Sequence, residues 1–480
     1  MKEILLNKDW YFHRGDIDTT PSNARGLPYI NAKTERYHQG PASRLYVPTV
    51  DGHSYNRLYT ADRWEKVELP HDYVIGDVTE EKNDRALGFV KYDNAWYRRR
   101  FTLPEEWRGK RITLLFHGVA TRSTVYLNGC LAGRSFTGYC PFEVDISDIC
   151  LFGEGKDNVL AVYVNTQEHE GWWYEGAGIY RDVYLRVYDP VSVDLWGVYV
   201  APVRTENGWE APVEVTVRND SFRRRLVKVR TSVKDTDGIS VAESETNCYI
   251  DASAVKPVIT VLKFGNVKLW SPETPDMYIC TAEVVSGEYS DEQKVRFGFR
   301  EFSVDADKGL FINGKHYKIK GVCGHADCGL TGKAVPDNLH RYKVSLMKEM
   351  GANGYRCSHY PQAEALMDAL DENGFIVMDE TRWFDTSEEA VKQLKTLVKR
   401  DRNRPGVFFW SVGNEEPFQS EDRGRRIFRR LYEEVRKLDA TRPILSAVDD
   451  PMHSEVFDDA DVIGINYHLE TYDRIHEKYP

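Results

Sequence analysis

The chain has two periodic patterns of apolar and polar positions, and the first gives way to the second near residue 300. Before it, short runs alternate between apolar and polar residues, as in residues 123–129 and 159–164. This period of two is typical of strands with one buried and one solvent-facing side. After it, apolar runs of strand length alternate with segments of helical periodicity, a pattern that predicts parallel βαβ units.

The alternating part of the chain predicts two β-sandwich domains. In residues 1–185 the strands are closely spaced, no long helix intervenes, and Asn128-Gly129 is a strong hairpin turn, so we expect a jelly-roll domain. Residues 186–300 carry about seven alternating runs, which fits an immunoglobulin-like sandwich. The polar stretch 15–62 is expected to be a long loop. The aromatic stretch 171–182 is either a packed corner or a loop that reaches another domain's pocket.

Residues 301–480 predict the amino-terminal part of a (β/α)8 barrel. About six strands fit, whereas a closed barrel needs eight; the runs are residues 317–322, 353–357, 375–378, 407–410, 444–447 and 462–465. We therefore expect the first and last strands to have open outer edges, which favour aggregation. The first helix is expected to share one apolar face among Leu339, Tyr342, Leu346, Met347 and Met350.

Polar or ionisable residues follow successive predicted strands of this barrel: His325; Arg356 and His359; Asp379 and Glu380; Asn414 and Glu415; Tyr467 and His468. A lone histidine at a strand end is usually structural. A repeated set is typical of a catalytic face, because the carboxyl ends of barrel strands meet at one mouth. We expect these side chains to point into a common site.

The stretch 406–417 carries the central candidate for catalysis. Residues 407–410 have the length and composition of a buried strand, and Asn414 and Glu415 follow. A carboxylic acid held half out of water at such a strand end has a raised pKa and can protonate a leaving group. The alternative is a helix cap, in which Asn414 ends the strand and Glu415 starts a helix.

Composition excludes several classes of protein. The chain has 480 residues and a net charge of −11, which argues against a nucleic-acid binder. No apolar run is long enough for a membrane span and no signal peptide is evident, so a cytoplasmic location without membrane association is expected. The 8 cysteines form no C-x-x-C pair. They are expected to be reduced thiols, without a metal or other cofactor.

Several motifs, in order along nearly the whole chain, resemble glycoside hydrolase family 2, the β-galactosidase and β-glucuronidase family. The two sandwich domains carry them at residues 69–72, 125–129, 141–145, 178–183, 269–275 and 297–300. The barrel carries them at residues 321–325, 355–361, 378–380, 401–405 and 410–415. Each motif is weak alone, and their common order makes the resemblance specific.

The resemblance implies a jelly-roll sugar-binding domain, an immunoglobulin-like domain and a barrel that hydrolyses terminal β-linked sugars with retention of configuration. Glu415 matches the family's acid/base, which first protonates the leaving oxygen and then deprotonates water. Asn414 matches the residue that bonds the sugar 2-hydroxyl. The other expected substrate-binding residues are His325, Arg356, His359, Asp379, Glu380 and Tyr467. An arginine near a carboxylate would keep that carboxylate ionised, as a nucleophile requires.

The chain also departs from the family's pattern. The family's nucleophile is a Glu on strand seven, which is expected beyond residue 480, so the chain alone is expected to be weakly active or inactive. Arg404 stands where the family usually has His, and Glu175 where Pro is common. Three hypotheses remain: an exo-β-galactosidase, which we favour; a β-glucuronidase of the same family; and a non-catalytic carbohydrate-binding protein. A β-linked glycoside is the expected partner, and a homo-oligomer is left open.

Overall fold

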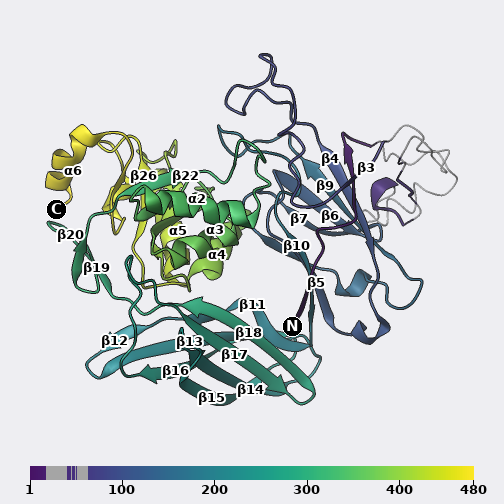
Figure 1. The fold of residues 1–480 in the computed structure, drawn as a ribbon, viewed down its shortest axis with the longest axis horizontal. Coiled ribbons are helices and arrows are strands. Elements are labelled where there is room, and N and C mark those ends of the chain that lie inside the picture. The colour runs from purple at the N-terminus through teal and green to yellow at the C-terminus, as the bar shows by residue number, and fades with distance from the viewer. Residues whose placement is uncertain (18–39, 45, 49, 51–62) are drawn as a thin grey trace. The chain divides into compact units, whose positions relative to one another are not determined.

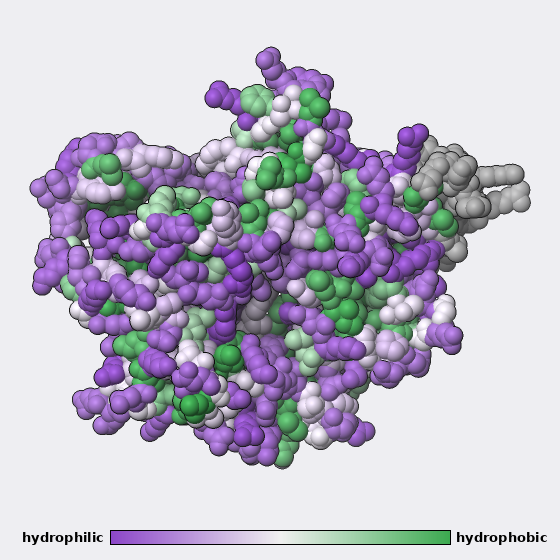
Figure 2. Space-filling model, in the orientation of Figure 1, coloured by the Kyte–Doolittle hydropathy of each residue, from purple (hydrophilic) through white to green (hydrophobic). Residues whose placement is uncertain are grey.

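The computed structural model describes residues 1–17, 40–44, 46–48, 50 and 63–480. Most of the loop expected over residues 15–62 therefore lies outside the described residues. The chain divides into two compact units, residues 1–188 with 326–336, and residues 189–325 with 337–480. On the face shown in Figure 2, hydrophilic residues predominate and apolar residues gather in small groups. In the described part, no helix is long and apolar enough to cross a membrane.

The first unit is a sandwich of two antiparallel sheets. One sheet has the order β1 (Lys2–Leu5), β10 (Val183–Tyr188), β5 (Arg111–Phe116), β8 (Phe142–Asp145). The other has the order β3 (Glu65–Val67), β2 (Trp10–Arg14), β4 (Ala95–Phe101), β9 (Asn158–Asn165), β6 (Arg122–Leu127), β7 (Cys130–Ser135). Short 3-10 helices occur at Gly40–Ala42, Glu105–Trp107 and Ser147–Ile149. Alternate residues of the strands, such as Val125 and Leu127, enter one core, as the period of two in the sequence predicts.

The predicted hairpin turn at Asn128-Gly129 joins β6 to β7. Both residues have positive φ, 53° at Asn128 and 86° at Gly129. A two-residue turn of this kind requires positive φ at both positions, which asparagine and glycine tolerate best.

Residues 326–336 follow the first barrel strand in sequence but belong to the first unit, and we call them the captured arm. The Asp72 carboxylate accepts hydrogen bonds from the backbone N–H groups of Lys333 (2.8 Å) and Ala177 (3.1 Å) and from the Tyr174 hydroxyl (2.8 Å). A Cβ atom at Gly332 would lie 2.2 Å from an Asp72 oxygen, so this approach requires glycine. Asp72 thus fixes the captured arm to the sandwich.

The Lys333 side chain of the captured arm is buried, and its ammonium lies 4.5 Å from the centre of the Tyr139 ring. Burial lowers the pKa of Lys333 to about 8. Tyr174 and Ala177, which both bond Asp72, belong to the aromatic stretch 171–182. Within the first unit, these two residues of the stretch pack beside Asp72.

The second unit begins with another antiparallel sandwich. In one sheet β13 (Gly208–Asn219) pairs with β11 (Val191–Val200), β12 (Val203–Thr205) and β16 (Ala254–Phe264). The other sheet has the order β15 (Ser240–Ile250), β14 (Arg225–Lys234), β17 (Tyr278–Ser286), β18 (Tyr289–Phe297). Burial alternates along the whole of β13, and the two inner faces share one core. The expected second sandwich is confirmed.

A parallel sheet of six strands follows, in the order β22 (Gly321–Gly324), β23 (Gly354–Cys357), β24 (Ile376–Glu380), β25 (Val407–Asn414), β26 (Ile444–Val448), β27 (Gly464–Ile465). The helices of this region are α2 (Asp337–Glu349), α3 (Glu364–Glu372), α4 (Glu388–Asp401), α5 (Asp422–Arg436) and α6 (Tyr472–Lys478) (Figure 1). The expected partial barrel is confirmed. Among the described residues, β22 and β27 have no strand at their outer edges.

A small antiparallel sheet precedes the barrel, with strands β19 (Phe302–Asp305), β20 (Gly309–Ile312) and β21 (Lys315–Tyr317). Short 3-10 helices occur in the barrel at Val456–Asp458 and Leu469–Thr471. The predicted first strand over residues 317–322 is therefore wrong in its bounds. Tyr317 pairs with Leu310 in the small sheet, and the first barrel strand begins at Gly321.

The predicted apolar face of α2 is also only partly buried. The helix buries His340 and Val344, whereas Tyr342, Leu346 and Met350 are 58%, 43% and 69% exposed. This helix follows the edge strand β22 and contacts α3 on one side. Because α3 is its main neighbour among the described elements, part of its apolar surface faces solvent.

Candidate active site

Polar side chains from the carboxyl ends of the parallel strands meet around Arg356, at the end of β23. Its guanidinium donates hydrogen bonds to Glu380 (3.0 Å from Nη2 to Oε2), to Asn466 (3.0 Å from Nη1 to Oδ1) and to Asn414 Oδ1. The planar fork of arginine can serve several acceptors in one fixed geometry. Arg356 therefore ties the ends of β24 and β25 to the residue that follows β27.

Glu380 is fully buried and has a donor on each carboxylate oxygen. Arg356 binds Oε2, His359 Nδ1 lies 2.8 Å from Oε1, and the Ser411 hydroxyl donates to Oε2 at 2.8 Å. With these partners, both oxygens of the carboxylate accept hydrogen bonds and its orientation is fixed. Glu380 thus links Arg356, His359 and Ser411 in one cluster.

Glu415 lies one residue beyond β25 and is half-buried. Its backbone N–H donates to Ala447 O of β26 at 2.8 Å, and Asn466 Nδ2 donates to its Oε1 at 2.7 Å. Its φ is +53°, in the left-handed region that non-glycine residues seldom adopt. Such conformations cluster at functional sites. The helix-cap alternative is wrong, because α5 begins only at Asp422.

Asn414 has its side-chain oxygen fully engaged. Oδ1 accepts from Arg356 and, at 3.0 Å, from Asn466 Nδ2. Because both donors bind the oxygen, the amide orientation is fixed by the network. The Nδ2 group of Asn414 has no acceptor among the described residues, so it is available to donate to a ligand hydroxyl.

Asn466 is a site residue that sequence reasoning missed. It bonds Arg356, Asn414 and Glu415 at once. The available signal was its position directly after the short strand β27, the same position that singled out Tyr467. Tyr467 itself is 77% exposed, and a hydrogen bond with Glu415 raises its pKa.

Two histidines extend the cluster toward β22. The rings of His325 and His359 are edge to face with centroids 5.5 Å apart. His325 Nδ1 lies 3.2 Å from the hydroxyl of Tyr360, which is fully buried. These contacts place His325 beside His359, as expected for residues at adjacent strand ends.

Asp379 does not join this cluster, and this expectation is corrected. It lies beside Glu380 in β24, and neighbouring residues of a strand face opposite sides. Its carboxyl is buried near Asp401 and Arg400 of α4, and burial together with Asp401 raises its pKa well above the usual range. His468 also lies apart, with its ring nitrogen 2.9 Å from Glu470.

Glu416 is a second site residue that sequence reasoning did not select. Its Oε1 accepts from the backbone N–H of Asn414 at 3.1 Å. Burial raises the pKa of Glu416 to about 7, and the nearby Glu380 acts in the same direction. No group of three metal-binding side chains occurs in the described part of the chain. The arrangement places two carboxyl groups, those of Glu415 and Glu416, next to an Asn414 amide that has a donor group open to a ligand.

Comparisons with known proteins give the same ordering of domains. Three family models match successive segments: a glycosyl hydrolase 2 galactose-binding domain-like model over residues 66–176, glycosyl hydrolases family 2 over 193–300, and the glycosyl hydrolases family 2 TIM barrel domain over 304–478. A solved structure of a family 2 member from Bacteroides cellulosilyticus DSM 14838 is similar with a TM-score of 0.84 at 29% identity, covering 100% of this chain and 62% of that one.

Curated relatives are similar over most of this chain. The β-galactosidase BoGH2A of Bacteroides ovatus is 32% identical over 470 residues, covering 87% of this chain and 55% of the relative. A β-glucuronidase of Formosa agariphila is 30% identical over 444 residues, covering 85% of this chain and 42% of the relative. The chain thus spans about half the length of these relatives. Because three consecutive family models match and these relatives are similar over most of the chain, the chain belongs to glycoside hydrolase family 2.

Proposed function

We propose that this chain carries the acid/base side of a retaining exo-β-glycosidase, with Glu415 as the proton donor and acceptor. The observation that supports it most is the position of Glu415 at a strand end, held by Asn466 beside Asn414 and Arg356. A retaining mechanism needs a second carboxylate as nucleophile. Glu380 is fully buried, which leaves its carboxylate no open face toward an anomeric carbon, so we propose that the nucleophile is supplied outside these 480 residues.

In the proposed reaction Glu415 first gives its proton to the glycosidic oxygen while the nucleophilic carboxylate forms a bond to the anomeric carbon. The leaving alcohol departs with that proton. Glu415, now a carboxylate, takes a proton from water as the water oxygen attacks the anomeric carbon and releases the nucleophile. Each cycle returns Glu415 to its protonated form.

The neighbouring residues would bind the sugar. The free Nδ2 group of Asn414 is placed to donate to a sugar hydroxyl. Arg356 holds Asn414 in place through a hydrogen bond, and Glu380 does the same for His359. His325, His359 and Tyr467 are proposed to line the subsite. Hydrogen bonds to a sugar hydroxyl that strengthen in the transition state contribute to catalysis in such enzymes.

β-Galactosides are the first proposed substrates, because a β-galactosidase is the relative with 32% identity over most of this chain. β-Glucuronides are the second candidates, because relatives named β-glucuronidase reach 30% and 31% identity.

A binding measurement on the 480-residue chain tests the proposed site. Isopropyl β-D-thiogalactoside and phenyl β-D-thioglucuronide resist hydrolysis and can be titrated calorimetrically in parallel. We expect one of them to bind, and Asn414→Ala to weaken that binding about tenfold, the loss of one good hydrogen bond. The control is Asn338→Ala, at an exposed position of α2. Binding of neither ligand, or equal binding by Asn414→Ala, would contradict the proposal.

A further inference from the structure

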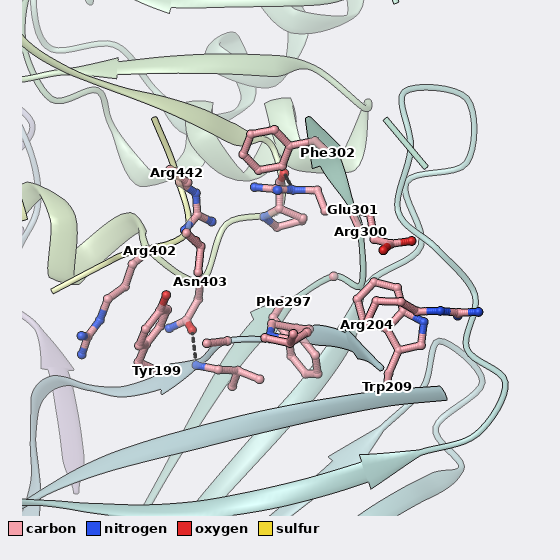
Figure 3. Close-up of a pocket in the computed structure, with 17 residues that line it drawn as sticks. Tyr199, Arg204, Trp209, Phe297, Arg300, Glu301, Phe302, Arg402, Asn403 and Arg442 are labelled. Carbon is pink, nitrogen blue, oxygen red and sulfur yellow. Dashed lines mark hydrogen bonds between the residues drawn. The ribbon is translucent and has the colours of Figure 1, made fainter. Parts of the chain in front are cut away.

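Strand β25 leads to Glu415 at its carboxyl end, and its opposite end is firmly held. There the carbonyl oxygen of Val407 accepts from Arg300 Nη2 at 2.6 Å and from Arg442 Nε at 2.7 Å. Asn403, just before the strand, bonds the backbone of β11, and it lines a pocket together with both arginines (Figure 3). Because the start of the strand is fixed, the direction of the Glu415 side chain is set by the last residues of β25.

The end of β25 departs from a regular strand. Ser411 pairs with Leu445 of β26 and Asn414 pairs with Ala447, so β25 has one extra residue here, as in a β-bulge. Bulges next to active sites redirect side chains. Glu415 then follows with its φ of +53°. A left-handed conformation is unfavourable for a residue with a Cβ atom and persists only where the surrounding structure holds it.

Two backbone N–H groups at this left-handed residue have acceptors that hold it. The Glu415 N–H donates to Ala447 O at 2.8 Å, and the Asn414 N–H donates to Glu416 Oε1 at 3.1 Å. The Glu416 side chain therefore folds back past Glu415 and bonds the residue before it. A Cβ atom at Gly413 would lie 3.0 Å from Glu416 Cγ. The glycine thus leaves the space that the folded-back side chain occupies.

The bond from Glu416 to the backbone does not depend on the charge of its carboxyl group. Burial raises the pKa of Glu416 to about 7; of the charged groups around it, Arg382 lowers this pKa and Glu380 raises it. Both the protonated and the ionised carboxyl group keep an oxygen that can accept from the Asn414 N–H. Glutamine would keep such an oxygen as well, whereas methionine would fill a similar space without one.

Resting on the proposed role of Glu415 as the acid/base, we propose that Glu416 is its positioning residue. The Glu416 side chain holds Asn414 and Glu415 in the backbone conformation that aims the Glu415 carboxyl group at the glycosidic oxygen. Proton transfer requires the acid to lie within hydrogen-bond reach of that oxygen. A small displacement of a catalytic group is costly to the rate. Loss of this bond should therefore weaken acid catalysis and leave the rest of the site in place.

Hydrogen exchange in the 480-residue chain tests whether Glu416 holds this backbone, without any substrate. In Glu416→Met the amide hydrogen of Asn414 should exchange at least about fivefold faster, the loss of one hydrogen bond. Glu416→Gln should restore slow exchange. Glu421→Met, at an exposed position before α5, is the matched control and should change nothing. Glu416→Ala repeats the test if the methionine variant does not fold, and unchanged exchange in the variant that folds overturns the proposal.

Kinetics of the protein extended to the length of its relatives test the effect on the acid. The substrates are phenyl and 2,4-dinitrophenyl β-galactosides, with the matching β-glucuronides in parallel. The phenyl glycoside needs the acid to leave, and the dinitrophenyl glycoside needs little acid assistance. Glu416→Met should lower kcat/KM at least about tenfold for the phenyl glycoside and less than about twofold for the dinitrophenyl glycoside. Glu416→Gln should restore most of the loss.

Glu415→Gln separates the positioning role from the acid/base assignment, because it should slow the phenyl glycoside far more than the dinitrophenyl glycoside. If it does so and Glu416→Met slows both glycosides equally or neither, the positioning role alone is overturned. A loss in Glu416→Gln as large as that in Glu415→Gln would make Glu416 itself the proton donor and would also overturn it. If Glu415→Gln does not discriminate between the glycosides, the acid/base assignment fails and the positioning role fails with it.

Discussion

At the scale of single residues, Glu416 is a second carboxyl group beside the proposed acid/base Glu415. Its pKa of about 7 exceeds the value of 4.5 expected for an unperturbed glutamate, because burial disfavours the charged form. A group whose pKa is raised on folding is protonated more readily in the folded state. The fold therefore loses stability as pH rises from about 4.5 to about 7.

Glu416→Gln removes this penalty and keeps an oxygen to accept from the Asn414 N–H. We expect the variant to be more stable than the unsubstituted chain at pH 8, by at most about 3 kcal/mol, and equally stable at pH 4.5. Urea unfolding at the two pH values measures the difference. Glu421→Gln, at an exposed position before α5, is the control and should give equal stability at both. A gain that is the same at both pH values would show that Glu416 does not titrate with a raised pKa.

At the scale of elements, Asp72 holds the captured arm to the first sandwich. Asp72→Ala leaves the N–H groups of Lys333 and Ala177 without their acceptor in a buried place. We expect a loss of at least about 2 kcal/mol in the free energy of unfolding of this unit. We also expect trypsin to cleave after Lys333, which is buried in the folded chain, more quickly. Asp148→Ala, at an exposed position, is the control, and an unchanged cleavage rate in Asp72→Ala would contradict this role.

The exposed apolar face of α2 predicts self-association of the 480-residue chain. Tyr342 and Leu346 lie four residues apart on α2 and are exposed, as is Met350, which follows the helix. Exposed apolar patches beside an unpaired strand edge favour contacts between molecules. Sedimentation velocity should show association that Leu346→Lys reduces. Leu330→Lys, in the captured arm, should leave it unchanged, although Leu330 is 89% exposed.

The elements that could be predicted from sequence are those with a strong local pattern. The buried run 407–410 and the polar residues after it correctly place β25 and Asn414. The pattern could not show which of Asp379 and Glu380 faces the strand-end cluster, because neighbouring residues of a strand point to opposite faces of the sheet. It also could not reveal the contact between Asp72 and the captured arm, since those residues are far apart in sequence and meet only in the folded unit.

At the scale of the whole molecule, the family assignment and the strand-end cluster support one account, in which Glu415 moves protons for a carboxylate supplied elsewhere. The chain spans 55% of its β-galactosidase relative. The 480 residues alone should therefore release 4-nitrophenol from aryl β-glycosides feebly or not at all, because general acid catalysis alone contributes only about 10²–10⁴-fold. Full turnover by this chain would mean that one of its own carboxylates is the nucleophile.

The most direct test uses Glu415→Gln in a form of the protein extended to the length of its relatives. A 2,4-dinitrophenyl β-galactoside needs little acid assistance to leave, so the glycosyl-enzyme should form in a burst and then persist, because no base activates water. Sodium azide, which needs no deprotonation, should restore turnover in the variant and yield the β-glycosyl azide. No burst, or steady turnover equal to that of the unsubstituted protein without azide, would contradict the assignment of Glu415 as the acid/base.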